Sequence, residues 1–149
     1  MNPIRNSVKA IIIRDGHVLL TKNEDKDGFF YLFPGGGQNA GEDMRTALRR
    51  ECLEEIGVLV SVGGLRWVRD YIAQNHEFAQ FDGDVHQVEL YFECTIESDS
   101  EPSNGTGKDT NQVSVEWVAL DRLDTVKVYP KIFQKGLDQF DAIYLGDIN

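Results

Sequence analysis

The chain has 149 residues, of which 41% are hydrophobic and 27% are charged, a balance typical of a single globular domain. No apolar run approaches the roughly 20 residues that a membrane-spanning helix requires, and Arg14-Asp15-Gly16 follows the N-terminal apolar run too soon for a signal peptide. The formal net charge of −10 disfavours binding to a nucleic-acid polymer, because an acidic surface repels a phosphate backbone. Neither Cys52 nor Cys94 belongs to a CxxC pair, so we expect two buried thiols in a reduced, cytoplasmic protein without a zinc site.

The first third of the chain predicts strands followed by one helix. The dipeptide Asp15-Gly16 between two apolar runs is typical of a β-hairpin, and Pro34 with three glycines ends a later aromatic strand. A helix is expected from about Asp43 to Ile56, with Gly57 as its stop signal. The strands expected before this helix are Val8–Ile13, His17–Lys22 and Phe29–Phe33.

The remainder predicts more strands, two polar loops and a second helix. The segments Gln74–Val85 and Glu97–Gln112 are polar and are expected to be exposed loops. Pro130 is a suitable first-turn residue for a second helix that ends near Phe140. The expected strands are Val58–Val62 and Leu65–Ala73 around a Gly63-Gly64 turn, then Gln87–Ile96 and Val113–Leu120.

Three glutamates crowd one side of the first predicted helix. At 100° per residue, Glu51, Glu54 and Glu55 fall within about a third of a turn. Glu51 and Glu55 also project near Ala47 and Leu48, which we expect to face the core. Charge runs are usually solvated, but carboxylates directed inward repel one another and need a counter-charge. A hard divalent cation provides that charge, so the pattern predicts a metal site.

The glycines before this helix suit close contact with a ligand, because glycine allows a positive φ and a close backbone approach. The peptide units of Gly35–Gly37 can offer a carbonyl to a metal and N–H groups to phosphate. Gly41 allows a sharp turn into the helix, and Glu42 lies where the helix N-terminus favours negative charge. These glycines follow three strands, so they are weak support for a dinucleotide-binding fold.

The segment Gly36–Val58, GGQNAGEDMRTALRRECLEEIGV, resembles the Nudix box of the Nudix hydrolase family. Its signature is Gly, five residues, Glu, seven residues, Arg-Glu, an aliphatic, any residue, Glu-Glu, any residue, Gly and an aliphatic. The one departure is Cys52 at an aliphatic position, and Tyr31 stands upstream where Trp is common. A chance match to its seven single-type positions is on the order of one in a million. The matching residues are Gly36, Glu42, Arg50, Glu51, Cys52, Glu54, Glu55, Gly57 and Val58.

The resemblance implies a Nudix-type α/β/α sandwich with a mixed β-sheet, as one domain over residues 1–149. It implies hydrolysis of a phosphoanhydride bond in a nucleoside diphosphate linked to another moiety: a nucleotide sugar, a dinucleotide or a nucleoside triphosphate. The cofactor it implies is Mg²⁺ or Mn²⁺, and the partner is a small nucleotide rather than a membrane or a nucleic acid; the oligomeric state, a homodimer included, is left open. The implied sites are catalytic Glu51, Glu54 and Arg50, substrate-binding Gly36, Gly37 and Tyr31, and metal-binding Gly35, Glu51, Glu54 and Glu55.

Several roles stay open at this point. In some family members the residue matching Glu51 is the general base, but here the base is unassigned. Family members often recruit a later acid, and the candidates here are Glu77, Asp82, Asp84, Glu89 and Glu116. Lys22, Arg69 and Lys127 are candidate phosphate contacts, and His86 is expected to be structural. The base or sugar is expected to be read by the two polar loops, with Tyr31 or Phe29 as stacking surfaces.

Two other functions compete with hydrolysis. A non-catalytic, nucleotide-sensing domain is the main alternative, but such relatives usually have damaged boxes. An isomerase of isopentenyl diphosphate on the same fold departs from the intact box. Subfamily motifs do not fix the substrate: Ala73-Gln74 replaces the Pro of ADP-ribose enzymes, Asn75-His76 replaces the Tyr of dinucleoside-polyphosphate enzymes, and the coenzyme A and NADH signatures are missing.

Overall fold

The computed structural model describes residues 3–149, with the side chain of Asp82 outside the described set. Within these residues, nine strands form one sheet in the order β8-β3-β2-β1-β6-β5-β9, while β4 pairs with β1 and β7 pairs with β2. The strands are β1 Arg5–Arg14, β2 His17–Asp25, β3 Gly28–Leu32, β4 Gly35–Gly37, β5 Val60–Ile72, β6 His86–Ile96, β7 Gln112–Ala119, β8 Val128–Tyr129 and β9 Tyr144–Asp147. The helices are α1 Met44–Ile56 and α2 Ala79–Asp82, with 3₁₀ turns η1 Ala73–Asn75, η2 Leu120–Thr125 and η3 Lys131–Lys135.

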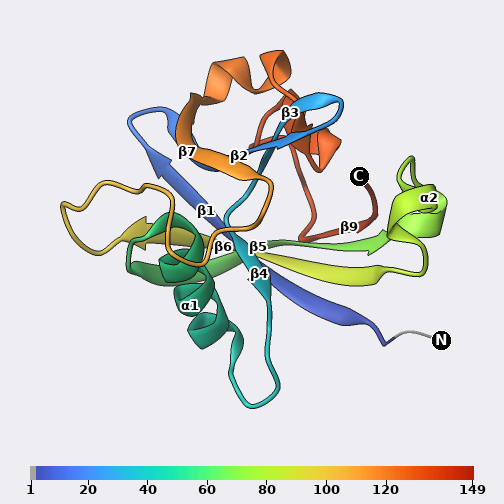
Figure 1. Ribbon diagram of the computed structural model, residues 1–149, viewed down its shortest axis with the longest axis horizontal. Helices are drawn as coiled ribbons and strands as arrows, with labels where there is room; N and C mark the ends of the chain where they lie inside the picture. Colours follow the sequence, from blue (N-terminus) through green and yellow to red (C-terminus); the bar gives the residue numbers. More distant parts are fainter. Residues whose placement is uncertain (1–2) are drawn as a thin grey trace.

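Strand β1 joins the two halves of the sheet. One edge of β1 pairs in parallel with β6, and the other pairs antiparallel with β4 and then with β2. The β1–β2 turn is the predicted one, because Asp15 and Gly16 have φ values of 51° and 74°, the positive values a two-residue hairpin turn requires. Figure 1 shows α1 on one side of this arrangement, and β7 with η2 and η3 gathered around β2 and β3 on the other.

Alternation along β1 gives the molecule two hydrophobic clusters. Val8, Ala10 and Ile12 face α1 and pack in a first cluster. This cluster also contains the two free cysteines, Cys52 and Cys94, which are buried as predicted. Ile11 points the opposite way into a second cluster, as strand geometry requires. The second cluster contains a group of aromatic rings in mutual contact, formed by Phe33, Trp67, Tyr91 and Phe133.

The mixed sheet with α1 on its face confirms the predicted fold class, but two expected elements differ. The segment predicted as two strands around Gly63-Gly64 is one 13-residue strand, β5, whose register shifts between Val62 and Trp67 absorb the glycines. The backbone of β5 therefore pairs with β6 on both sides of this irregularity.

The helix predicted from Pro130 to Phe140 is wrong: only the five residues of η3 are helical. Gly136 ends η3 with a φ of 112°, outside the helical region. The layer opposite α1 therefore consists of short 3₁₀ turns. The expected loop at 74–85 also contains two short helical turns, η1 and α2. In the described residues, no helix combines the length and apolarity needed to cross a membrane.

Candidate active site

Helix α1 is fixed at both ends by the residues the sequence indicated. The Asp43 carboxylate accepts a hydrogen bond from the Thr46 N–H at 2.8 Å, and Gly57 adopts φ 70° with its N–H donating to the Cys52 carbonyl. Both are standard caps for a helix. Burial of Ala47, Leu48, Cys52 and Ile56 sets the rotation of α1, so that Glu51 and Glu55 face β4.

Strand β4 presents part of its backbone to these glutamates. The bonds Ala10 N–H to Pro34 O and Gln38 N–H to Asn6 O bracket the Val8–Gly36 pair, so Gly36 directs its peptide groups toward β1. Gly35 and Gly37 direct theirs toward α1. There the Gly35 N–H donates to Glu55 Oε1 at 3.3 Å, and the Gly37 carbonyl accepts from Arg50 Nη2 at 3.0 Å. The Gly35 carbonyl and the Gly37 N–H are the groups that this alternation leaves facing the helix.

Arg50 organises the acidic side chains. Its Nε and Nη2 bind the two oxygens of Glu42 at 3.2 and 2.6 Å, and its Nη1 contacts Glu51 at 3.0 Å and Glu54 at 3.4 Å. The bond from Arg50 lowers the pKa of Glu42, and the same pairing raises the pKa of Arg50. Arg50 thus holds Glu42, Glu51 and Glu54 through charge-assisted hydrogen bonds.

Glu55 is the buried member of the glutamate cluster, with 5% of its surface exposed. Burial raises its pKa to about 7, opposed by the charge of Lys9 and the Gly35 N–H, and reinforced by the charges of Asp109 and Glu51. Asp109 is a functional candidate that the sequence reasoning missed. It lies in the 97–112 loop, 54 positions from Glu55 in the chain, and no local pattern marks it.

Glu51 and Glu54 differ in environment. A Cβ built on Gly36 would lie 2.6 Å from the Glu51 carboxylate, so only glycine leaves room for that group. The Glu51 side chain is 18% exposed and that of Glu54 is 45% exposed. Among the described residues no three Asp, Glu, His or Cys side chains converge as a cation cage, and Arg50 holds Glu51 and Glu54. The donor set still fits a hard divalent cation, because it consists of carboxylate oxygens beside the Gly35 carbonyl.

The later acids proposed from the sequence do not approach Glu55 through any contact that the structure gives. Glu89 is 5% exposed, and its carboxylate accepts hydrogen bonds from Arg69 Nε at 2.8 Å and from Tyr91 Oη. Burial alone would raise its pKa; the charges of Arg69 and Lys9 bring it down to about 2. The side chain of Asp82 lies outside the described residues. The others have different partners: Glu77 pairs with Lys131, Asp84 with Gln74, and Glu116 with Lys22.

Tyr31 does not have the exposed position that a stacking role needs. It is 9% exposed and belongs to the second cluster, because its position on β3 directs it toward the 3₁₀ turns. Phe29 is 49% exposed, with the Lys22 ammonium 4.1 Å from its ring centroid. Of the candidate phosphate contacts, Arg69 is bound to Glu89, and Lys127 lies over Tyr129. His86 is bonded to Asp70 at 2.7 Å, consistent with the structural role expected.

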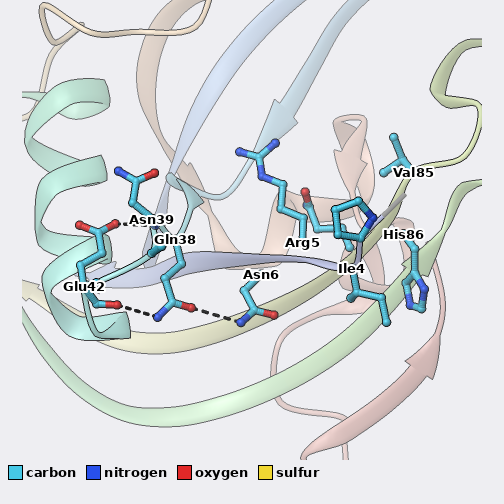
Figure 2. Close-up of a pocket in the computed structure, with 12 residues that line it drawn as sticks. Ile4, Arg5, Asn6, Gln38, Asn39, Glu42, Val85 and His86 are labelled. Carbon is cyan, nitrogen blue, oxygen red and sulfur yellow. Dashed lines mark hydrogen bonds between the residues drawn. The ribbon is translucent and has the colours of Figure 1, made fainter. Parts of the chain in front are cut away.

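A cavity of about 620 Å³ lies where the turn before α1 meets the first residues of β1 and β6. Figure 2 shows a chain of hydrogen bonds along it, from the Asn6 amide to Gln38 and from Gln38 to the backbone carbonyl of Glu42. Arg5 also lines the cavity and projects from β1 on the side opposite Asn6 (Figure 2). The turn that carries Glu42 therefore forms part of the cavity wall.

Comparisons with known proteins identify the same family that the sequence motif resembles. The NUDIX domain family model matches residues 3–136. The chain is 31% identical over 121 residues to the nucleoside triphosphatase NudI of Salmonella agona (strain SL483), covering 78% of this chain and 86% of that protein. It is 29% identical over 127 residues to its counterpart from Enterobacter sp. (strain 638), covering 82% and 86%. The crystal structure of the MutT NUDIX hydrolase from Burkholderia pseudomallei superposes with a TM-score of 0.70 at 24% identity, covering 91% of this chain and 99% of that one.

Proposed function

The chain belongs to the Nudix hydrolase family, and we propose that it hydrolyses a phosphoanhydride bond of a nucleoside triphosphate with the help of Mg²⁺ or Mn²⁺. The observation that carries the proposal is the position of Glu51 and Glu55 against β4, with Arg50 holding Glu51 and Glu54. The choice of a triphosphate over a nucleotide sugar or a dinucleotide rests on the names of the relatives.

In this proposal the oxygens of Glu51, Glu54 and Glu55, with the Gly35 carbonyl, hold the metal. When bound, the metal neutralises phosphate oxygens and lowers the pKa of a coordinated water. Arg50 keeps the carboxylates in place through Glu42 and Gly37, and the Gly37 N–H faces the substrate phosphates. A cation held by Glu55 would lower the pKa of this carboxylate from its metal-free value of about 7, and the general base is left unassigned among the three glutamates.

A panel of nucleotides tests the substrate class. The protein is incubated with nucleoside triphosphates, nucleotide sugars and dinucleotides, each with Mg²⁺, with Mn²⁺ or with chelator. Phosphate is measured before and after added phosphatase and pyrophosphatase. We expect triphosphates to be cleaved to a monophosphate and pyrophosphate, only with metal. Preference for a nucleotide sugar would overturn the triphosphate proposal, and metal-independent binding of nucleotides without turnover would favour the sensing domain.

Charge-neutral variants test the site. Each of Glu51→Gln, Glu54→Gln and Glu55→Gln keeps the side-chain shape and should lower the rate by roughly 10²–10⁴. Glu93→Gln is the control, because Glu93 lies exposed on β6 and pairs with Arg66. Near-normal rates in all three variants with metal present would show that this cluster is not the active site.

A further inference from the structure

Arg5, at the start of β1, lies flat against the glycine segment of the site. A Cβ built on Gly37 would be 2.3 Å from Arg5 Nη2, 2.8 Å from Nε and 2.9 Å from Cζ. Three atoms of the planar guanidinium are therefore close to one α-carbon. This approach is possible only because residue 37 has no side chain.

Within the described residues, the side-chain N–H donors of Arg5 are unpaired, whereas those of Arg50 are engaged in hydrogen bonds. Arg50 contacts three glutamates and the Gly37 carbonyl. In the part of the chain that the structure describes, Arg5 makes no ion pair or side-chain hydrogen bond, and the residue is exposed. A guanidinium is always charged at physiological pH and has five N–H donors.

The position of Arg5 relative to the glutamates follows from strand geometry. Successive residues of a strand point to opposite faces, so the Glu51 carboxylate lies against Gly36 on one face of β4 and Arg5 lies against Gly37 on the other. With adjacent α-carbons 3.8 Å apart, the two groups are roughly 9 Å from one another. A polyphosphate that follows the α1-facing edge of β4, beside the Gly35 carbonyl and the Gly37 N–H, can extend from Glu51 toward Arg5.

We propose that Arg5 is a substrate-binding residue that holds a phosphate of the nucleotide adjacent to the phosphate bound at the glutamate cluster. The proposal rests on the proposed function and names a specific cation in that site. Its fork of donors matches two phosphate oxygens at once, which a point charge does not. Gly37 has the complementary task of keeping the guanidinium beside β4.

The test measures binding rather than turnover. The affinity of a non-hydrolysable nucleoside triphosphate analogue and of the corresponding unphosphorylated nucleoside is determined by calorimetry for the wild type and for Arg5→Gln. Loss of a charge-assisted, bidentate contact should weaken binding of the analogue about 10–100-fold and leave nucleoside binding unchanged. Arg122→Gln is the matched control, since Arg122 is an exposed arginine on η2, and it should bind like the wild type.

Two more variants separate a phosphate contact from a packing role. Gly37→Ala should displace the guanidinium without changing the net charge, weaken the analogue similarly, and add little when combined with Arg5→Gln. Arg5→Lys keeps the charge and should recover part of the affinity. Unchanged analogue affinity in Arg5→Gln would overturn the role of Arg5, while turnover by the wild type would leave the proposed function intact. Failure of the wild type to hydrolyse any nucleotide would refute the function instead.

Discussion

At the scale of single residues, the consecutive glycines of β4 exclude side chains for different reasons. A Cβ at Gly35 would lie 1.9 Å from the Val8 carbonyl oxygen, and the residue has φ 141°. A Cβ at Gly36 would instead meet the carboxylate of Glu51, the end of a flexible side chain. Substitutions at adjacent positions should therefore separate folding from catalysis.

We expect Gly35→Ala to lower the free energy of unfolding by roughly 2–5 kcal/mol, because the backbone clash and the positive φ both strain the folded chain. Gly36→Ala should cost much less stability but lower kcat, because it displaces Glu51. Urea denaturation and turnover on the best nucleotide measure the two effects. An active Gly36→Ala variant would contradict the importance of the Glu51 position.

The buried carboxylate of Glu55 should make the metal-free protein less stable as the pH rises. Its pKa is about 7 in the folded state against 4.5 for the ordinary group, so between these values the folded state holds a proton that the unfolded state has lost. The free energy of unfolding should fall by up to about 3 kcal/mol from pH 4.5 to 7 and then level off. Glu55→Gln should remove this slope and be the more stable protein at pH 8.

Chemical denaturation at a series of pH values, with chelator present, measures the slope. Glu51→Gln is the control: Glu51 already contacts Arg50, so its neutralisation should bring no comparable gain. Mutual repulsion alone predicts a slight gain in stability for all three glutamine variants, whereas the contacts of Arg50 with Glu51 and Glu54 lead us to expect the gain at Glu55 only. Parallel pH profiles for the wild type and Glu55→Gln would show that burial does not perturb this group.

At the scale of elements, the 97–112 loop caps the helix that carries the glutamates. The N–H groups of Gly107, Gly105 and Ser103 donate to the last carbonyls of α1, those of Glu54, Glu55 and Ile56. Gln112 Nε2 also donates to the Glu55 carbonyl at 2.9 Å. Replacing this loop by a short turn should alter the order of preference among substrates. Because the loop also caps α1, the replacement should affect the helix as well.

Gly105→Ala tests this coupling. Its Cβ would lie 2.1 Å from the Glu54 carbonyl oxygen, so the loop must move away from the helix end. We expect a loss of about 1–3 kcal/mol in the free energy of unfolding and weaker metal binding. Gly64→Ala is the control, since nothing lies within 4 Å of a Cβ there. Thermal unfolding and metal titration compare the variants; equal metal affinity in both would separate the loop from the site.

The sequence predicted the elements whose signals are local. The Asp15-Gly16 turn and α1 with Gly57 at its end depend on residues within one turn or one helix, and both are found as predicted. The single strand β5 was not predictable, because it depends on pairing with β6 rather than on its own glycines. The positions of Asp109 and Arg5 depend on chain segments that meet only in the folded protein.

At the scale of the whole molecule, one buried ion pair connects the sheet with the C-terminus. Arg69 on β5 binds Glu89 on β6, and its Nη1 also donates to the Ile148 carbonyl at 2.6 Å. Both side chains are at most 7% exposed. Arg69→Met should destabilise the protein by about 3–5 kcal/mol, because it leaves a buried carboxylate without its counter-charge.

Urea denaturation measures this loss. The double variant Arg69→Met/Glu89→Met should recover part of it, because replacing both charges by apolar groups removes the uncompensated charge. Lys22→Met, which breaks the more exposed pair with Glu116, should cost about 1 kcal/mol or less. A double variant no more stable than Arg69→Met would show that the pair holds the sheet by packing rather than by charge.

The two buried cysteines allow opening of the folded protein to be measured by the rate of thiol labelling. Cys52 and Cys94 are at most 4% exposed, and burial raises the pKa of Cys52 well above its usual range and that of Cys94 to about 12. A thiol reagent reacts with the thiolate, so labelling at neutral pH must wait for the first hydrophobic cluster to open. Metal and nucleotide bound to the folded state should slow labelling in proportion to their occupancy. Labelling rates followed by mass spectrometry would then rank ligands by affinity even for variants that no longer turn over substrate.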